Sequence, residues 1–216
     1  MKKGFIFDLD GVITDTAKYH FIAWRDLGTE IGVDVDLKFN EQLKGISRMD
    51  SLDRILAHGG KENDFTLDQK EALAAKKNTH YVELLQSLTP ADLLPGVKEF
   101  LDQASTKGVP CAIASASKNA PFILEKLGVK DQFAGIVDPA TLHKGKPDPE
   151  IFIKAAELLN IQPEEAVGFE DAQAGIDGIK ACNMYAVGVL SGEPLHGADL
   201  TCHELTELNM DELLQK

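Results

Sequence analysis

The sequence predicts an α/β fold, with a Rossmann-like parallel sheet core and an inserted helical cap of the four-helix bundle type. Short apolar runs suited to buried strands recur along the chain, and segments with helical patterning separate most of them. One long stretch, residues 16–90, has helical patterning alone. The 216 residues are enough for a core domain with a smaller domain inserted into it.

Five apolar runs are the expected strands of the sheet. They lie at residues 4–9, 110–116, 135–138, 166–169 and 186–190. Helical patterning marks residues 97–107, 120–127, 149–159 and 174–181. Alternating strands and helices favour a parallel sheet that is covered on both faces and binds ligands beyond the carboxyl ends of its strands. Asp8, Ser115 and Glu170 each fall at such an end.

Residues 16–90 break the alternation, because one helical segment follows another with no convincing strand. An insertion after the first strand explains this most simply. We expect a catalytic core formed by residues 1–15 and 91–216, and a cap domain formed by residues 16–90 that closes over the strand ends. Hinges are expected near residues 14–16 and 90–95.

Charge and composition exclude several classes of partner. The formal net charge of −13 disfavours nucleic acid and anionic membranes, which bind mainly through clustered Lys and Arg side chains. No apolar run reaches about 18 residues, and the N-terminus lacks the pattern of a signal peptide. The three cysteines have no C-x-x-C spacing, so we expect reduced thiols in place of a disulfide framework or zinc site. These features favour a cytoplasmic protein with no nucleic-acid or membrane partner. We expect it to be a monomer with small-molecule ligands.

The stretch F-D-L-D-G-V-I-T-D-T, residues 7–16, places Asp8, Asp10 and Asp15 at the end of a buried strand. A carboxylate in an apolar setting is costly unless a cation, a hydrogen-bond shell or a reaction stabilises its charge. Glu170 and Asp171, in G-F-E-D-A, add two carboxylates at another strand end, although alone they would more often cap a helix. Oxygen-rich clusters of this kind suit Mg²⁺. For Asp15, a structural role in the turn is the alternative.

Two segments supply groups that can bind a phosphate or balance the charge of these carboxylates. A-S-A-S-K-N, residues 114–119, stands where a strand ends and a helix begins, so its hydroxyl and backbone N–H groups can bind a phosphate. Lys146, in H-K-G-K-P-D-P at residues 143–149, can balance both the phosphate and the carboxylates. With Mg²⁺ and a lysine present, an aspartate can attack phosphorus without prohibitive repulsion.

Together, D-L-D-G-V (8–12), A-S-A-S-K-N (114–119), K-P (146–147) and G-F-E-D (168–171) resemble the four motifs of the haloacid dehalogenase (HAD) superfamily. The resemblance covers the whole chain, including that superfamily's alpha-helical cap. It implies that Asp8 is a nucleophile that becomes an aspartyl phosphate, and that Asp10 is the general acid and base. The implied ligands of one Mg²⁺ per active site are Asp8, Asp10 through its carbonyl, Glu170 and Asp171. The implied phosphoryl-binding residues are Ser115, Ala116 and Lys146.

The predicted cap contributes further candidates. Thr16, His20 and Trp24 are spaced by four residues and would form one stripe on the first cap helix, facing the hinge and cleft. Ordinary core packing is the alternative for His20 and Trp24. Within the superfamily, F-D-L-D-G-V-I-T-D-T-A-x-Y-H-F-x-A-W, L-K-G-I-S-R-x-D-S-L and S-A-S-K-N resemble its sugar-phosphate mutases. That resemblance implies a bidentate grip of Arg48 on the phosphate that is not transferred. It also implies substrate contacts by His20, Lys44, Gly45, Ile46, Ser47, Ser51, Lys77, Ser117, Lys118 and Asn119.

The resemblance implies a phosphomutase that interconverts beta-D-glucose 1-phosphate and glucose 6-phosphate through an aspartyl phosphate and beta-glucose 1,6-bisphosphate. Closure of the cap would keep water from the aspartyl phosphate. A sugar alkoxide leaving phosphorus needs a proton, which Asp10 can donate, so phosphate esters are favoured over dehalogenation or ion pumping. Two alternatives stay open. One is a sugar-phosphate phosphatase, and the other is a non-catalytic phosphosugar-binding module, which would tolerate Asp8→Asn.

Overall fold

A computed structural model describes residues 1–43, 46–192 and 194–216 of the protein. Two predicted substrate residues, Lys44 and Gly45, lie outside the described residues. The chain divides into two compact units. The sheet unit comprises Met1–Asp15 and Leu88–Lys216, and the helical unit comprises Thr16–Ser87. The cap domain was expected to end at residue 90, and the helical unit ends three residues earlier, at Ser87.

Six parallel strands form the sheet in the part of the chain that the structure describes, in the order β3-β2-β1-β4-β5-β6. They are β1 (Gly4–Phe7), β2 (Cys111–Ile113), β3 (Gly135–Ile136), β4 (Ala166–Glu170), β5 (Tyr185–Val189) and β6 (Leu200–Cys202). The predicted parallel α/β core is confirmed. The sequence did not predict β6, a three-residue edge strand with two exposed residues. Such a strand lacks the apolar run by which buried strands are recognised.

The strand β1 has a neighbour on each side and packs different side chains on the two faces of the sheet. Phe5 and Phe7 contact the rings of Phe100 and Phe169, with centroids 4.5 to 5.9 Å apart. Ile6 points to the opposite face, where it packs in a cluster that includes Phe152. This alternation with a period of two residues is the signature of a strand that is buried on both faces.

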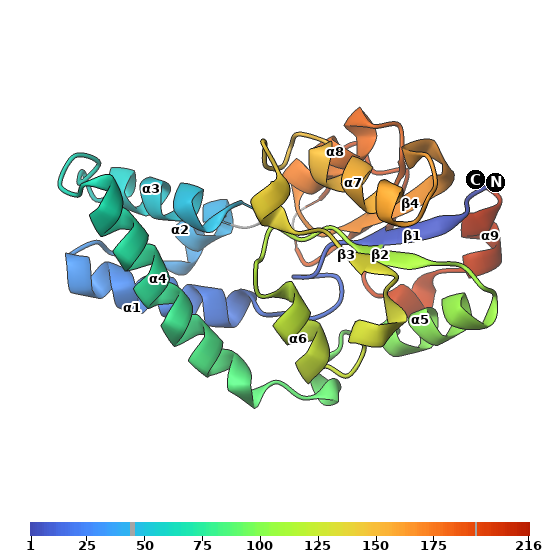
Figure 1. The fold of residues 1–216 in the computed structure, drawn as a ribbon, viewed down its shortest axis with the longest axis horizontal. Helices are drawn as coiled ribbons and strands as arrows, with labels where there is room; N and C mark the ends of the chain where they lie inside the picture. Colours follow the sequence, from blue (N-terminus) through green and yellow to red (C-terminus); the bar gives the residue numbers. More distant parts are fainter. Residues whose placement is uncertain (44–45, 193) are drawn as a thin grey trace. The chain divides into compact units, whose positions relative to one another are not determined.

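Helices cover both faces of the sheet (Figure 1). The helices α7 (Glu150–Leu158) and α8 (Gln173–Ala181) lie over one face, and α5 (Val97–Thr106) and α6 (Ala120–Lys126) lie over the other. The bounds of these four helices agree with the predicted ones to within one residue at either end. After the short α9 (Met210–Leu214), the chain ends beside its beginning, because Lys2 N donates a hydrogen bond of 2.8 Å to Leu214 O.

Three predicted strands were too long, and one of them, at residues 135–138, ends at Ile136. The run at residues 4–9 ends as a strand at Phe7, and the run at residues 110–116 ends at Ile113. After β1 the chain enters a tight loop, in which Leu9 O accepts hydrogen bonds from the backbone N–H groups of Ile13 and Thr14. Gly11 has a φ of +77°, a conformation that favours glycine. Asp8 and Asp10 therefore lie in a loop and not on a strand.

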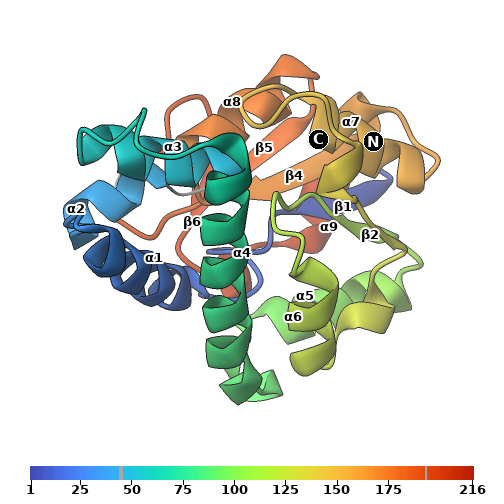
Figure 2. The same ribbon diagram turned by 60° about the vertical axis from the view of Figure 1, so that its left-hand side comes forward.

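The helical unit contains α1 (Ala17–Ile31), α2 (Leu37–Asn40), α3 (Arg48–His58) and α4 (Leu67–Leu84), and its described residues contain no strand (Figure 2). Thr66 caps α4 in a reciprocal pair with Gln69, and Gly32 in the left-handed conformation caps the C-terminal end of α1. Their apolar faces share a core that includes Trp24. None of the helices in the described ranges has the length and apolar character needed to cross a bilayer.

Thr16 is the N-cap of α1 and stands immediately before the helix, with φ −98° and ψ 3°. Its carbonyl accepts the first backbone hydrogen bond of the helix, 3.1 Å from His20 N, so the hydrogen-bonding pattern of the helix begins four residues before His20. The Thr16 hydroxyl is buried and accepts a hydrogen bond of 3.0 Å from the Tyr81 hydroxyl of α4.

Candidate active site

The core site forms where neighbouring strands end. Phe7, the last residue of β1, is in register with Ile113 of β2 and Phe169 of β4. Asp8 follows Phe7, Glu170 is the last residue of β4, and Ser115 follows β2 by two residues. Parallel strands in register bring the residues at their carboxyl ends to one edge, so these side chains meet although the sequence separates them widely.

A buried ion triad occupies this edge. Lys146 Nζ lies 2.8 Å from Asp8 Oδ1 and also contacts Glu170 Oε1. The side chains of Lys146 and Glu170 are each 1% exposed and that of Asp8 is 9% exposed, so little water screens the three charges. The Lys146 ammonium also lies over the ring of Phe152 in α7, 5.2 Å from its centroid. The predicted pairing of Lys146 with the carboxylates is present in the structure.

The neighbours of these groups shift their pKa values. Burial alone would lower the pKa of Lys146, but Asp8 and Glu170 outweigh burial and raise it above its ordinary value, so the ammonium stays charged. Burial raises the pKa of Glu170, and the Asp8 charge adds to this effect while Lys146 opposes it. A bound divalent cation would act in the opposite direction and favour the carboxylate.

The acidic residues fit a divalent cation. Oxygens of Asp8, Glu170 and Asp171 all lie within 4.8 Å of one another, which suits a hard cation with oxygen ligands. Glu170 is held in place because its Oε2 accepts hydrogen bonds from Asp171 N (3.0 Å) and Ala172 N (3.1 Å). Two glycines make room, since a Cβ at Gly11 would lie 2.1 Å from Asp171 Oδ2 and one at Gly175 would lie 2.0 Å from Glu170 Oε1.

The segment after β2 forms the other side of the edge. Ser115 is 3% exposed, and its hydroxyl accepts a hydrogen bond of 3.1 Å from Ser117 N. The Ser117 hydroxyl in turn accepts one of 3.2 Å from Asn119 N, just before α6 begins. Ala116 is half-buried and Lys118 is exposed. Hydroxyl groups therefore order the backbone of this loop, whose N–H groups precede a helix.

A second polar cluster lies inside the helical unit. Lys77, which is 3% exposed, places Nζ 2.8 Å from His20 Nδ1 and over the rings of Trp24 and Tyr81, at 4.4 Å and 4.7 Å from their centroids. The rings of His20 and Tyr81 are 4.0 Å apart. Two aromatic rings and an imidazole nitrogen thus replace the water around the buried ammonium.

His20 is neutral in this environment. Burial, with the positive charges of Lys77 and Arg48 as further causes, lowers its pKa well below 6.5. A neutral imidazole accepts a hydrogen bond at one nitrogen and donates at the other, so contact with the Lys77 ammonium places the proton on Nε2. Lys77 is buried because its ammonium packs against His20 and Trp24 of α1. Trp24, 2% exposed, belongs to the core of the helical unit.

The residues around α3 have local roles. Ser47 caps α3 by accepting a hydrogen bond from Asp50 N, and the Ser51 hydroxyl donates to Ser47 O. Ile46 packs against the core of the helical unit. Arg48 opens the helix half-buried, and burial lowers its pKa, although a guanidinium stays charged.

The sequence did not predict two residues of these clusters. Tyr81 follows Lys77 by four residues on α4, so helical spacing could have placed them on one face. Gly175 follows Glu170 by five residues, but nothing local indicates that a carboxylate occupies the space beside it. Only the packing of α8 on β4 reveals that requirement.

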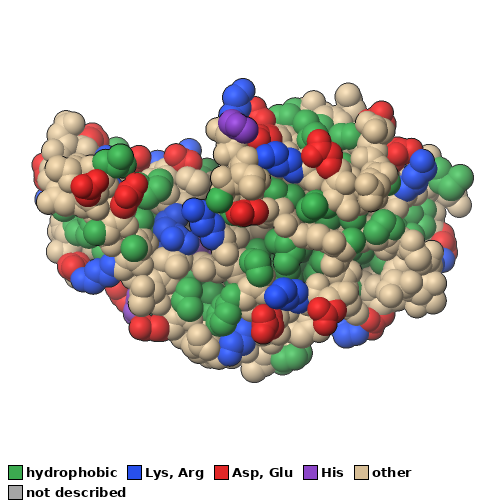
Figure 3. Space-filling view, in the orientation of Figure 1, with side chains coloured by type: hydrophobic (Ala, Val, Ile, Leu, Met, Phe, Trp, Pro, Cys, Tyr) green, Lys and Arg blue, Asp and Glu red, His purple; other side chains and the backbone are tan. Residues whose placement is uncertain are grey.

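The protein surface carries charges of both signs. On the face in Figure 3, acidic and basic side chains are interspersed, with hydrophobic ones between them. The buried cations described above, Lys146 and Lys77, differ from these because little water screens them.

Comparison with known proteins agrees with this geometry. A family model described as haloacid dehalogenase-like hydrolase matches residues 2–183. The chain therefore belongs to the haloacid dehalogenase-like hydrolase family, as its motifs predicted.

Individual proteins within this family are similar to the chain over most of its length. A beta-phosphoglucomutase from Bacillus subtilis is 48% identical over 211 residues, covering 98% of this chain and 93% of that protein. The crystal structure of a beta-phosphoglucomutase from Clostridium difficile superposes with a TM-score of 0.96 at 46% identity, covering 100% of this chain and 96% of that one. A phosphorylated carbohydrates phosphatase from Thermotoga maritima is 29% identical, covering 83% of this chain and 81% of that protein.

Proposed function

We propose that this protein is a phosphomutase that interconverts beta-D-glucose 1-phosphate and glucose 6-phosphate. The observation that carries the proposal is the buried contact of Lys146 with Asp8 and Glu170 at the strand ends, in a chain that is 48% identical to a beta-phosphoglucomutase. A nucleophilic carboxylate next to a charged lysine and a further carboxylate pair suits covalent phosphoryl transfer. The protein is expected to act as a monomer on small sugar phosphates.

Asp8 is the proposed nucleophile. Its carboxylate attacks phosphorus, the bond from phosphorus to the sugar oxygen breaks, and an aspartyl phosphate forms. Lys146 lies 2.8 Å from Asp8 and so reduces the repulsion between the attacking carboxylate and the phosphoryl oxygens. Ser115, together with the backbone of Ala116, is proposed to bind the same phosphoryl group from the end of β2.

Asp10 is the proposed general acid and base. It lies in the loop after β1, two residues from Asp8, and is only partly buried. It would protonate the departing sugar oxygen when the C1 phosphate moves to Asp8, and would deprotonate the C6 hydroxyl when Asp8 donates its phosphate. Beta-glucose 1,6-bisphosphate is the intermediate that one half-reaction forms and the other consumes.

The acidic residues are proposed to bind one Mg²⁺. Asp8, Glu170 and Asp171 would hold it with their carboxylates, and Asp10 with its main-chain carbonyl. When bound, the cation neutralises part of the negative charge that meets at the phosphoryl group.

The helical unit is proposed to select the substrate. His20, Lys77 and Arg48 supply donors and positive charge in this unit, and Thr16 is held by Tyr81. We assign Arg48 to the phosphate that is not transferred, because a guanidinium can bind two phosphate oxygens at once. The remaining proposed substrate contacts are Trp24, Lys44, Gly45, Ile46, Ser47 and Ser51, together with Ser117, Lys118 and Asn119 of the sheet unit.

A sugar-phosphate phosphatase is the second candidate, because a phosphatase of phosphorylated carbohydrates is among the relatives. The two functions differ only in whether a sugar hydroxyl or water accepts the phosphoryl group from Asp8. The same residues of the sheet unit would serve both reactions.

A paired assay separates the candidates. The purified protein is given Mg²⁺, beta-D-glucose 1-phosphate and a trace of beta-glucose 1,6-bisphosphate, and glucose 6-phosphate and free phosphate are followed together. We expect glucose 6-phosphate in large excess over free phosphate, and a loss of at least about 10³-fold in Asp8→Asn, which lacks the nucleophile. Free phosphate equal to substrate consumed would establish the phosphatase, and full turnover by Asp8→Asn would exclude covalent catalysis by Asp8.

A further inference from the structure

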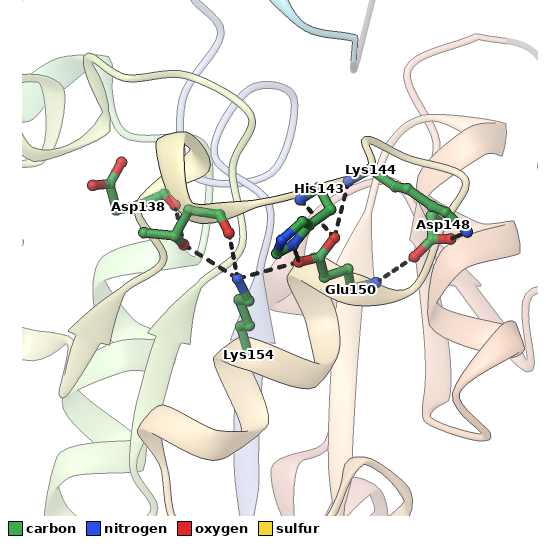
Figure 4. Close-up of polar contacts among 7 residues, drawn as sticks. Asp138, His143, Lys144, Asp148, Glu150 and Lys154 are labelled. Atoms are coloured by element: carbon green, nitrogen blue, oxygen red, sulfur yellow. Dashed lines mark hydrogen bonds and ion pairs between the residues drawn. The ribbon is translucent and has the colours of Figure 1, made fainter.

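The loop that carries Lys146 is bound to the first turn of α7 by a single carboxylate. Glu150 Oε2 accepts hydrogen bonds from two successive backbone N–H groups, those of His143 (2.8 Å) and Lys144 (2.9 Å). Its other oxygen, Oε1, lies 3.0 Å from His143 Nδ1 and 3.2 Å from Lys154 Nζ. Figure 4 shows Glu150 as the point on which these contacts converge.

Further contacts extend the anchor to both sides of Lys146. Before it, Lys154 Nζ donates a hydrogen bond of 2.6 Å to Thr141 O. After it, Asp148 N donates to Gly145 O (3.0 Å), and Glu150 N donates to Asp148 Oδ1 (3.1 Å). The loop is therefore attached to the start of α7 at both ends of the short stretch from which the Lys146 side chain reaches Asp8.

The charge of Glu150 suits this role. The contact with the His143 side chain, followed by hydrogen bonds from the Lys144 and His143 backbone, lowers the pKa of Glu150 to about 2. The carboxylate also lies in the first turn of α7, where the helix dipole favours negative charge. It stays ionised at neutral pH although its side chain is largely buried, with only 20% exposed.

We propose that Glu150 is a positioning residue that holds the backbone of residues 143–146 so that the Lys146 ammonium stands at Asp8. The inference rests on the proposed function in assigning a phosphoryl-transfer role to Lys146 and Asp8. Glu150 touches neither the reacting atoms nor the metal ligands, and it acts through the main chain. The same helix carries Phe152, whose ring centroid lies 5.2 Å from the Lys146 ammonium, so α7 contacts both the backbone and the side chain of this loop.

The test uses the full chain and two readouts. The first is the rate at which acetyl phosphate, a small phosphoryl donor without a sugar, phosphorylates Asp8 in Mg²⁺, followed by mass spectrometry. The second is hydrogen exchange at the amides of His143 and Lys144. Glu150→Ala is compared with Glu150→Gln, which keeps an oxygen acceptor, and with Glu157→Gln, which removes one charge from an exposed position on the same helix.

We expect Glu150→Ala to slow phosphorylation of Asp8 by about 10- to 100-fold, as a displacement of about 1 Å at a reacting group can do. The two amides should exchange at least about 10-fold faster, because they lose their acceptor. Glu150→Gln should recover most of both effects, and Glu157→Gln should change neither by more than about 2-fold.

A double-mutant cycle separates positioning from general stability. In a Lys146→Ala background, adding Glu150→Ala should slow phosphorylation by less than about 3-fold, because the group being positioned is gone. An equal loss in both backgrounds would overturn the proposal, as would faster amide exchange with an unchanged phosphorylation rate. A wild type that is phosphorylated but converts no beta-D-glucose 1-phosphate would refute the proposed function alone, because the acetyl phosphate results need no sugar.

Discussion

At the scale of single residues, Lys146 sets the charge balance of the core site. Its ammonium is almost fully buried and contacts both Asp8 and Glu170. Removing one member of a buried ion pair typically costs about 3–5 kcal/mol, because the other charge is left without a partner. Substitution of these residues therefore changes stability and chemistry together. Small residues around the site give cleaner tests of its geometry.

Gly175 is such a residue. A Cβ there would lie 2.0 Å from Glu170 Oε1, so the carboxylate must move, while alanine itself suits a helix better than glycine does. We expect Gly175→Ala to keep the fold and to weaken Mg²⁺ binding about 10- to 100-fold, as measured by isothermal titration calorimetry.

The matched control is Gly192→Ala, where a new Cβ would have no atom of the described residues within 4 Å apart from its chain neighbours. Its Mg²⁺ affinity should stay within about 2-fold of the wild type. If folded Gly175→Ala bound Mg²⁺ as tightly as the wild type, Glu170 could not be the ligand that we propose.

At the scale of elements, the pairing of α1 with α4 encloses His20 against Lys77 and Tyr81. The folded helical unit keeps His20 neutral, whereas an unfolded chain lets it take a proton near pH 6.5. The unfolded state thus binds more protons below that pH. By linkage, the free energy of unfolding must fall as the pH falls through and below 6.5.

Trp24 makes this measurable, since it is the one tryptophan of the sequence and lies buried in the helical unit. We expect urea unfolding followed by tryptophan fluorescence to show less stability at low pH, with a slope from His20 of at most about 1.4 kcal/mol per pH unit. His20→Gln should flatten that dependence. The control, His203→Gln, changes an exposed histidine of the sheet unit and should preserve it. The same slope in His20→Gln and the wild type would contradict the neutral state of His20.

At the scale of the whole molecule, the two units differ in their chemistry. Among the described residues, the acidic cluster that fits a metal lies in the sheet unit, while the Lys77 cluster lies in the helical unit. Each unit has its own hydrophobic core. A metal should therefore stabilise the sheet unit directly, because a ligand that binds only the folded state shifts the folding equilibrium.

We expect Mg²⁺ to raise the melting temperature followed by far-ultraviolet circular dichroism. At about 100 times its dissociation constant, the gain in free energy of unfolding should be about 2.7 kcal/mol. Asp171→Asn should abolish most of this gain, whereas Asp131→Asn, an exposed carboxylate of the same unit, should retain it. An undiminished gain in Asp171→Asn would place the metal elsewhere.

Much of this architecture could be predicted because its signals are local. Apolar runs predicted five of the six strands in the described chain, and helical periodicity placed the four larger helices of the sheet unit to within one residue. The end of β1 was predicted two residues too far along, because the turn after Phe7 is made by backbone hydrogen bonds to Leu9 that no residue pattern shows. β6 carries too little apolar surface to be recognised at all.

The sequence by itself determined the α/β class, the family motifs and the residue types of the site, because periodicity and short motifs are properties of neighbouring residues. Only the tertiary structure decided that Lys146 contacts both Asp8 and Glu170, that Tyr81 and Trp24 enclose Lys77, and that Glu150 holds the Lys146 loop. These contacts join residues on different strands, helices and loops. Their geometry depends on strand register and helix packing, which are set by the whole core and not by any one segment.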